Sequence, residues 1–496
     1  MEPNKNTYTG IVILLRYAAV IFSLIFIGIY IFVALSRIRY PFELEWMEGA
    51  SVIHVKRILE GKPLYIRPQL EFVPYYTPLY YYISALIALF SGIGFFPLRF
   101  VSFVSSLGCF SIIYHIVKKE TGNVSAGIIS AGLFAATFNA SGAWFDIARV
   151  DTLFLFLLLT AAYLIKFKPA PNTYILAGVI ICLSFLTKQS AFPISLSLIL
   201  YAVLFQRRLC LYFIIPYVIF FFATTLLLNY IHQGWYVFYI FELPGKHLII
   251  KEMIIKFWTR DILSPMFISC ILGIAFLIST YLKDERKKSA FYILFGIGMI
   301  GASWVVRFHE GGWINNLMPA HAFLSIMLGL GFHAFSFPVF PIPGKRIAIL
   351  SLLVVLFCLI QFAVLFYDPV TQIPTRKDRE AGQYLVETIK NIKGEIFIPY
   401  HSFLAEMAGK KSYLHAYGIF VITRGEESVK RSFINEIQTA LREQRFAAVI
   451  LDTTRLLDNF EMYYSQERVI FGDPNVFWPV TGMKTRPEFL FVPHNR

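Results

Sequence analysis

The sequence has 496 residues, of which 57% are hydrophobic and only 15% are charged. A soluble protein of this length carries about a quarter charged residues, so the composition excludes a soluble globular enzyme and predicts an integral membrane protein. The formal net charge is +14, yet residues 369–496 hold 17 Lys and Arg against 15 Asp and Glu. The excess positive charge therefore belongs to the apolar part of the chain, where it indicates cytoplasmic loops and not a nucleic-acid-binding surface.

Apolar segments long enough to form membrane spans recur through the first three quarters of the chain. The first of them is too long for a cleaved signal peptide, so we expect it to be retained. The pattern predicts a mainly α-helical transmembrane domain over residues 1–368 with eleven spans, near residues 11–35, 98–117, 123–143, 152–166, 173–187, 190–205, 211–231, 262–282, 289–306, 317–335 and 346–367.

A twelfth apolar helix, near residues 77–94, begins at Thr77-Pro78 and carries three consecutive tyrosines. Tyr clusters favour the membrane interface, so we expect this helix not to cross. The basic loops at Lys118, Arg207 and Lys283–Lys288 then all lie in the cytoplasm. The same topology gives a cytoplasmic N-terminus, a first outer loop over residues 36–97 and an extracytoplasmic C-terminal region.

The first outer loop contains three closely spaced carboxylates: Glu43, Glu45 and Glu48. Ionisable groups beside lipid are expensive, so their presence predicts function. A short helix is expected over residues 46–59. Glu45, just before it, and Glu48 are three residues apart, so we expect the two carboxylates to lie on one face. Glu48 begins the apolar row of that helix, where burial would raise its pKa toward that of a general base. The alternative is that these carboxylates only pair with Lys56, Arg57 or Arg99.

Two further polar segments follow on the same face of the membrane. Asp146, Arg149 and Asp151 precede the fourth span; they form either a self-satisfied ion network or a phosphate-binding arginine beside acidic residues. Lys188, in the Leu186-Thr187-Lys188 turn, either extends to the interface or binds a phosphate.

Between the ninth and tenth spans, Arg307 and His309 are candidates for binding a lipid phosphate, and His309 with Glu310 is a weaker metal candidate. Residues 232–261 alternate aromatic and basic side chains, which predicts an interfacial helix that anchors the chain to lipid. The five cysteines lie in or at the ends of apolar runs without metal-binding spacing.

Residues 369–496 alternate helix-like and strand-like patterns, which predicts a small α/β domain. We expect a helix over residues 376–390 and strands at 395–399 and 447–452. His401, His415 and Tyr417 follow the first strand and either contact an acceptor or only pack the loop.

Four motifs follow one another along the chain: the acidic sequence Glu45–Gly49, the helix start Pro78–Tyr82, the Arg-x-Asp segment Arg149–Asp151 and the turn Leu186–Lys188. In this order they resemble the GT-C superfamily of polyprenyl-phosphate-sugar-dependent glycosyltransferases, in particular bacterial relatives of the protein O-mannosyltransferases and the lipid A aminoarabinose transferase. The resemblance covers about residues 10–335.

The chain departs from that family at two places. Met47-Glu48 stands where many relatives have Asp-Glu, which leaves both Glu45 and Glu48 as the candidate base. Tyr76-Thr77-Pro78 lacks the Lys or His that relatives often carry, so Lys188, Arg149 or Arg307 would have to bind the donor phosphate.

The resemblance implies an inverting glycosyltransferase of the inner (plasma) membrane that moves a sugar from a polyprenyl phosphate to a hydroxyl of a lipid, glycan or protein acceptor on the outer face. No cofactor is required, although Asp146 and Asp151 could hold a divalent cation. We predict Glu45, Glu48 and Asp151 as catalytic groups, Arg149, Lys188, Arg307 and His309 as donor-phosphate ligands, and Glu43, Asp146, Tyr76 and Asn315 as other pocket residues. The alternatives are a transporter or flippase for a lipid-linked sugar and a non-catalytic subunit of a glycan-assembly complex.

Overall fold

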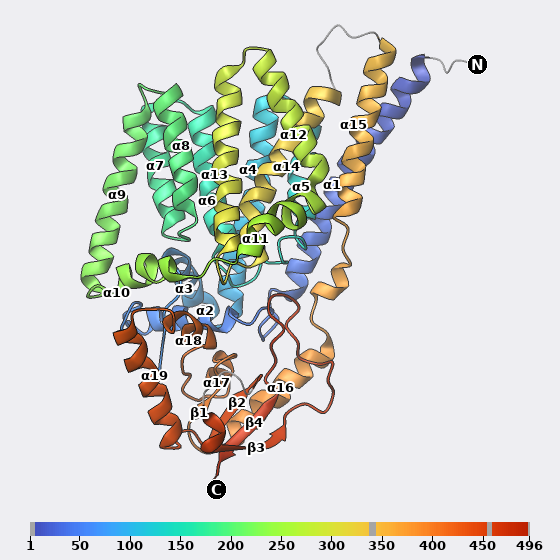
Figure 1. Cartoon of the computed structure of the whole chain (residues 1–496). Helices are drawn as coiled ribbons and strands as arrows, with labels where there is room; N and C mark the ends of the chain where they lie inside the picture. Colours follow the sequence, from blue (N-terminus) through green and yellow to red (C-terminus); the bar gives the residue numbers. More distant parts are fainter. Residues whose placement is uncertain (1–4, 337–343, 454–458, 495–496) are drawn as a thin grey trace.

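The structure, a computed structural model, describes residues 5–336, 344–453 and 459–494. Long apolar helices form an upright bundle, and a smaller domain lies against one end of it (Figure 1). The bundle helices are α1 (Lys5–Arg37), α4 (Phe95–Thr121), α5 (Val124–Ala136), α6 (Asp151–Phe167), α7 (Pro171–Phe185), α8 (Ala191–Phe205), α9 (Cys210–Ile231), α12 (Ser264–Leu282), α13 (Arg286–Phe308), α14 (Met318–Ser336) and α15 (Gly344–Val364).

The bundle confirms a multi-pass membrane fold, but the predicted number of spans stays a prediction. By length and apolar composition, six helices of the described chain could each cross a bilayer, or seven if the bent pair Ile349–Val364 and Pro369–Asn391 counts as one. Helices α5, α7 and α8 are apolar but have only 13 to 15 residues. An α-helix rises about 1.5 Å per residue, so these helices are shorter than the usual hydrocarbon thickness of about 30 Å.

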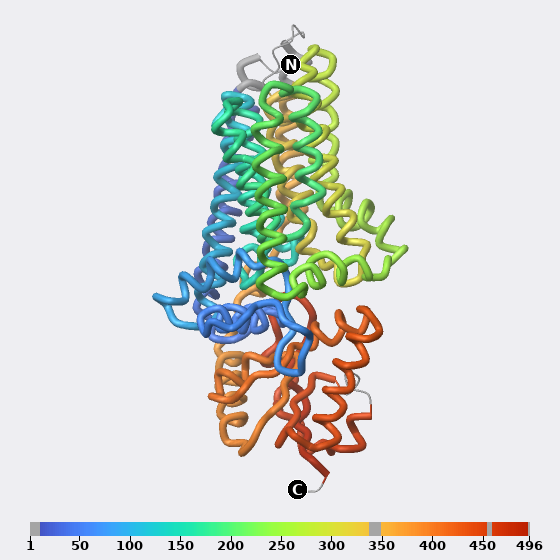
Figure 2. The backbone as a smooth tube through the Cα atoms, turned by 90° about the vertical axis from the view of Figure 1, so that its left-hand side faces the viewer, coloured from blue at the N-terminus to red at the C-terminus, as the bar shows by residue number. Residues whose placement is uncertain are grey.

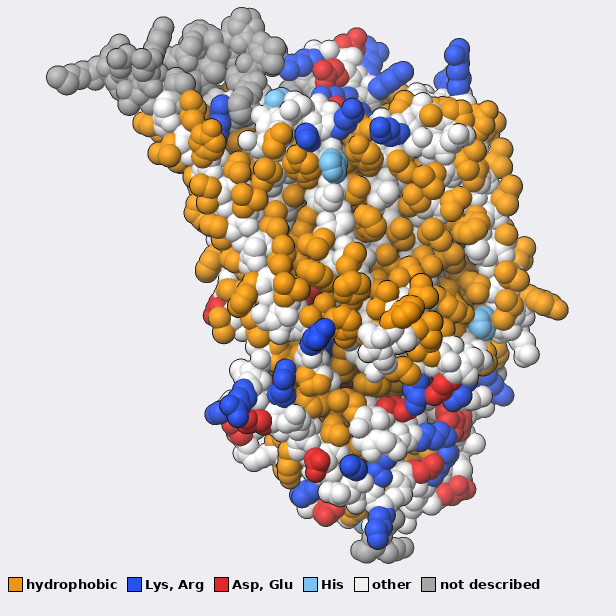
Figure 3. Space-filling view, turned by 180° about the vertical axis from the view of Figure 1, so that it is seen from behind, with side chains coloured by type: hydrophobic (Ala, Val, Ile, Leu, Met, Phe, Trp, Pro, Cys, Tyr) orange, Lys and Arg blue, Asp and Glu red, His pale blue; other side chains and the backbone are white. Residues whose placement is uncertain are grey.

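Basic residues from separate loops gather at the end of the bundle away from the C-terminal domain (Figure 3). Glu120 near the end of α4 pairs with Lys166 of α6 at 3.6 Å and with Lys288 of α13 at 3.2 Å. Tyr292 donates a hydrogen bond to the same carboxylate at 2.9 Å. Loops far apart in the sequence therefore meet at one end of the bundle, as the charge pattern predicts.

The segment between α1 and α4, expected to be the first outer loop, lies between the bundle and the C-terminal domain (Figures 1 and 2). It contains α2 (Glu48–Leu59), which ends before Gly61 as predicted, and α3 (Leu79–Ser91). Helix α3 has 13 residues and packs beside α2 and α4. Its exposed apolar side chains include Leu86, Leu89 and Phe90, which suits a helix at the membrane interface.

The C-terminal domain has a four-stranded sheet in the order β1-β2-β4-β3, in which β1 and β2 are parallel and the other neighbours are antiparallel. The predicted helix and both predicted strands are present with slightly different limits, whereas β3 and β4 were not predicted. The elements are α16 (Arg376–Asn391), β1 (Ile396–Phe397), α17 (Phe403–Met407), α18 (Ala416–Ile422), α19 (Glu427–Arg442), β2 (Ala448–Leu451), β3 (Tyr464–Val469) and β4 (Phe489–Pro493).

The span expected at residues 123–143 is too long, because α5 ends at Ala136 and an irregular buried segment follows. A buried ion pair holds this segment. The Arg37 guanidinium donates to both oxygens of Asp146, at 2.8 and 2.6 Å, and to the Ala143 carbonyl at 2.8 Å. Asp146 thus pairs with α1 and not with Arg149, so the proposed network of Arg149 between two aspartates is wrong.

Replacing Asp146 with Asn should destabilise the fold, because it leaves the buried Arg37 charge without a carboxylate. Breaking one side of a buried pair costs about 3–5 kcal/mol. Denaturant unfolding of the purified protein in detergent measures this loss. The control is Glu380→Gln, which removes the exposed partner of Arg376 and should change stability by less than about 0.5 kcal/mol. Equal stability of the two variants would contradict a structural role for Asp146.

Candidate active site

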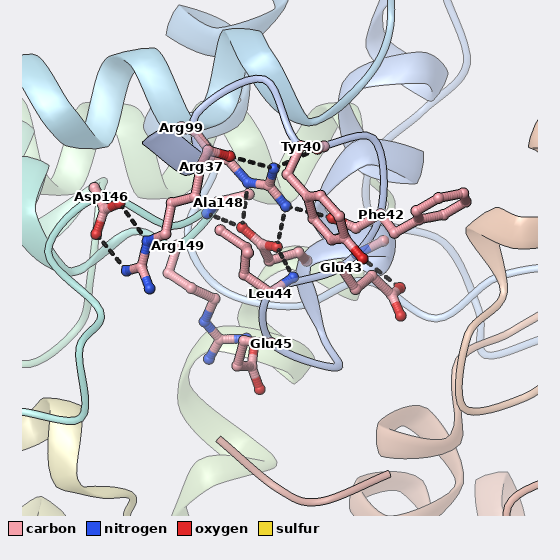
Figure 4. A network of polar contacts seen from close by, with 12 residues as sticks. Arg37, Tyr40, Phe42, Glu43, Leu44, Glu45, Arg99, Asp146, Ala148 and Arg149 are labelled. Atoms are coloured by element: carbon pink, nitrogen blue, oxygen red, sulfur yellow. Dashed lines mark hydrogen bonds and ion pairs between the residues drawn. The ribbon is translucent and has the colours of Figure 1, made fainter. Parts of the chain in front are cut away.

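The Glu48 carboxylate is buried and accepts four hydrogen bonds. Arg99 donates to its two oxygens at 2.9 and 2.6 Å, the Leu44 amide donates at 2.6 Å, and the Ala148 amide donates at 2.7 Å; Figure 4 labels these three donor residues. Burial alone would raise the pKa of Glu48, but Arg99 and the backbone donors outweigh it and lower the pKa. The expected raised pKa is therefore wrong for Glu48, and the alternative of pairing with Arg99 is observed.

Glu45 is equally buried but poorly satisfied. Its Oε2 accepts one hydrogen bond, from the Met47 amide at 3.2 Å. Its Oε1 has no hydrogen-bond partner within the described parts of the chain. Burial raises the pKa of Glu45 to about 8, and the nearby Arg149 charge only partly opposes this effect. Glu45, and not Glu48, therefore has the proton affinity of a general base.

Arg149 lies beside Glu45, with Nη1 3.7 Å from Glu45 Oε2. Its Nη2 donates to the Tyr76 hydroxyl at 2.6 Å, and its guanidinium stacks over Trp144. Nε and Nη1 are buried and form no hydrogen bond to any described residue. Tyr76 has a positive φ of 53°, which is uncommon for an aromatic residue and directs its ring toward Arg149.

A second cation–carboxylate group lies at the start of α6. Lys188 Nζ donates to Asp151 Oδ1 at 2.6 Å and to Asn316 Oδ1 at 2.8 Å. Asn315 donates to the same Asp151 oxygen at 2.8 Å. Asp151 Oδ2 is buried and unpaired by any described residue. Asp151 thus fixes the position of the Lys188 ammonium, which remains on the wall of a cavity.

That cavity has a volume of about 340 Å³ and is lined by segments from five separate regions of the chain. Lys188 and Asn316 lie on its wall together with Tyr76, the residue that also contacts Arg149. His309, predicted as a phosphate ligand, also lines the cavity, and its Nδ1 lies 2.6 Å from the Val305 carbonyl oxygen. Tyr76 therefore connects the cavity wall to the Arg149–Glu45 pair.

Arg307 is placed differently from the prediction. Its Nε donates to Asp261 at 2.9 Å and its Nη1 donates to the Gly312 carbonyl at 2.6 Å. Asp261, which follows Arg260 at the start of an apolar run, is a buried partner of Arg307 that was not predicted from the sequence. No group of three or more His, Cys, Asp or Glu side chains in the described residues is arranged to hold a metal ion.

The C-terminal domain covers the acidic loop, residues 40–48. His401 lies between Glu43, which contacts its Nδ1, and Asp452, whose Oδ2 is 3.0 Å from its Nε2. Despite burial, the two carboxylates raise the pKa of His401 to about 10, so the imidazole is charged at neutral pH. Glu43 is thereby engaged in the contact between domain and loop. His415 also belongs to this contact, since its Nε2 is 3.1 Å from the Trp46 carbonyl.

Residues 74–232 match the family described as Dolichyl-phosphate-mannose-protein mannosyltransferase. The fold is similar to ArnT from Cupriavidus metallidurans bound to undecaprenyl phosphate, with a TM-score of 0.60, 11% identity, and coverage of 95% of this chain and 97% of that chain. Apo ArnT from the same organism gives a TM-score of 0.58 and 13% identity, covering 96% of this chain and 98% of that one. No curated protein matches the sequence significantly.

The chain has the GT-C fold, of the type shared by ArnT. The resemblance inferred from the four motifs is therefore confirmed. At 11% and 13% identity the structural match shows that the folds agree, and it does not show that the proteins bind the same ligands. The family match begins at Pro74 and so includes Tyr76, Arg149 and Lys188 but not the acidic loop.

Replacing Glu48 with Gln should destabilise the protein at pH 7, because Arg99 would lose the one charged partner it has among the described residues. The folded-state pKa of Glu48 is depressed, so its contribution is present above the unfolded pKa and is lost as the pH falls through the folded pKa. The gap between wild-type and E48Q melting temperatures, measured in detergent, should therefore narrow from pH 7 toward pH 3. A gap that stays constant over this range would contradict an ionised Glu48.

Proposed function

We propose that this chain is an integral-membrane glycosyltransferase that moves a sugar from a polyprenyl-phosphate donor to an acceptor hydroxyl on the outer face of the membrane. The observation that carries the proposal is the pair of Glu45 and Arg149. Both are buried, they lie 3.7 Å apart, and both have polar atoms that no described residue satisfies. Buried polar atoms without partners are rare, so they indicate groups that await a ligand.

Glu45 acts as the general base. Its unpaired Oε1 can accept the proton of the acceptor hydroxyl as that oxygen attacks the anomeric carbon of the donor sugar. Glu48 has no free position for such a proton, because its oxygens already accept four hydrogen bonds. We therefore assign Glu48 a positioning role. Attack by the acceptor in one displacement inverts the anomeric centre.

Arg149 and Lys188 stabilise the phosphate that leaves. The negative charge on the polyprenyl phosphate increases as its bond to the sugar breaks, so nearby cations lower the barrier to sugar transfer. Lys188 is held on the cavity wall by Asp151 and Asn316. Arg149 has two nitrogens that form no hydrogen bond with any described residue, and Tyr76 can release a third. ArnT, which has the same fold, was crystallised with undecaprenyl phosphate.

The proposed reaction does not route through a metal. Asp146 cannot share a cation with Asp151 in this arrangement, because both its oxygens accept hydrogen bonds from Arg37. The positive charge at the leaving group is supplied by the two side chains Arg149 and Lys188. We do not assign Arg307 this role, because it does not line the cavity and its guanidinium donates to Asp261 and to the Gly312 carbonyl.

Glu45→Gln should reduce glycosyl transfer by at least about 100-fold, because the amide cannot accept the proton. The measurement is mass spectrometry of surface glycans in cells that lack the chain and carry each variant. Glu43→Gln is the matched control, since Glu43 lies two residues away but contacts His401. Unchanged glycans with normally expressed E45Q would favour a transporter or a non-catalytic subunit instead.

The rate of transfer should depend on the protonation of Glu45. The base must be deprotonated to act, and its pKa is about 8, so kcat/KM should rise with pH and level off above that value. Because Arg149 lowers the pKa of Glu45, Arg149→Gln should move the inflection to higher pH. Purified enzyme assayed from pH 6 to pH 10 tests both statements. A profile that is flat across pH 8 would contradict Glu45 as the base.

A further inference from the structure

Tyr239, His247 and Glu310 line the 340 Å³ cavity. Each has one side-chain polar atom that is shielded from solvent and forms no hydrogen bond in the described residues: the hydroxyl of Tyr239, Nε2 of His247 and Oε2 of Glu310. Each residue comes from a segment outside the four motifs that identify the fold. Leaving buried donors or acceptors unpaired is costly, about 1–3 kcal/mol each, so three of them around one cavity require an explanation.

The three groups are fixed by separate contacts. Tyr239 is 5% exposed and its ring packs against Trp235 and Tyr65. Glu310 is held from two sides, because Arg424 of the C-terminal domain binds its Oε1 and its backbone amide donates to Leu248 at 2.9 Å.

His247 lies next to Glu310, and burial lowers the pKa of its imidazole, so the ring is neutral at pH 7. The unpaired His247 Nε2 can therefore be a donor or an acceptor, according to its tautomer.

We propose that Tyr239, His247 and Glu310 form the subsite that binds and selects the sugar of the polyprenyl-phosphate donor. A sugar ring carries several hydroxyls that each donate and accept, which matches a phenol, a neutral imidazole and a carboxylate acceptor. The Tyr75, Tyr76 and Tyr417 side chains on the same wall add apolar surface for the ring. A phosphate does not suit this part of the cavity, because it would face the Glu310 carboxylate.

The position of the subsite fits the phosphate site of the proposed function, on which it rests. Lys188 and Asn316 line the same cavity, so one ligand can place its phosphate against Lys188 and its sugar against Glu310. Arg424 acts through Glu310 as a positioning residue. The C-terminal domain therefore contributes to donor selection. Residues 232–261, expected from sequence only to anchor the chain to lipid, also supply Tyr239 and His247.

Binding measurements on the full-length protein in detergent test the proposal. The probes are sugar-free undecaprenyl phosphate and the same lipid carrying glucose, mannose, galactose or arabinose. We expect at least one sugar to tighten wild-type binding by tenfold or more. Tyr239→Phe should reduce that gain about fivefold and Glu310→Gln tenfold or more, while affinity for undecaprenyl phosphate stays unchanged.

Tyr236→Phe is the matched control. Tyr236 lies three residues before Tyr239 and is also buried with a hydroxyl unpaired by any described residue, but it does not line the cavity. This variant should keep the full gain from the sugar. Arg424→Gln should lose part of the gain in affinity from the sugar. Its melting temperature should stay unchanged, which distinguishes this loss from a folding defect.

Any of four outcomes overturns the subsite. The first is that no sugar on the panel improves wild-type binding, and the second is that Y239F and E310Q both keep the full gain in affinity from the sugar. The third is that Y236F loses as much of this gain as Y239F, and the fourth is that the variants lose affinity for undecaprenyl phosphate as much as for the sugar-bearing lipid. Lys188→Ala separates this result from the proposed function. This variant should weaken the binding of both undecaprenyl phosphate and the sugar-bearing lipid. If it weakens the binding of neither, the assignment of Lys188 to the phosphate is wrong, whatever the Tyr239 and Glu310 variants show.

Discussion

The ion pair between Glu48 and Arg99 is the interaction on which the site depends. Both side chains are fully buried, and their bidentate contact joins the acidic loop to α4. The same carboxylate binds the amides of Leu44 and Ala148, which are the immediate neighbours of Glu45 and Arg149. One carboxylate therefore sets the position of both groups to which we assign chemistry. Arg99 also donates to the carbonyls of Tyr40 and Phe42, which leaves the loop little freedom.

Glu45 and Glu48 show how proton affinity depends on partners and not on burial alone. Both carboxylates are fully buried, and burial is the largest influence on each pKa. Glu48 receives a full set of donors and is held ionised, whereas Glu45 has one backbone donor and an arginine 3.7 Å away. An environment that separates the proton affinities of two neighbouring carboxylates is a recurring way to divide acid–base and structural roles.

Much of the fold could be predicted from sequence, because hydropathy and charge act over long segments. The bundle helices, the short helix after the acidic loop and the two parallel strands β1 and β2 of the domain follow from periodicity alone. The site could be predicted only to the level of candidate residues. The spacing of residues along the sequence does not indicate that Arg37 binds Asp146 or that Arg307 binds Asp261, because these partners are 109 and 46 residues apart. The choice between Glu45 and Glu48 likewise depends on Ala148, a backbone amide that no side-chain pattern can reveal.

The C-terminal domain reaches both ends of the proposed reaction centre. At one end, Thr481 donates its amide to the Leu44 carbonyl, and the next residue, Gly482, lies directly against Glu45. A Cβ at Gly482 would lie 2.6 Å from Glu45 Cγ, and φ there is +77°, so only glycine fits this close approach. At the other end, Arg424 holds Glu310. The bundle alone would leave Glu45 open to water, where its pKa would fall back toward that of an ordinary carboxylate. The domain thus keeps the base desolvated and helps to shape the cavity, which makes it a structural part of the site.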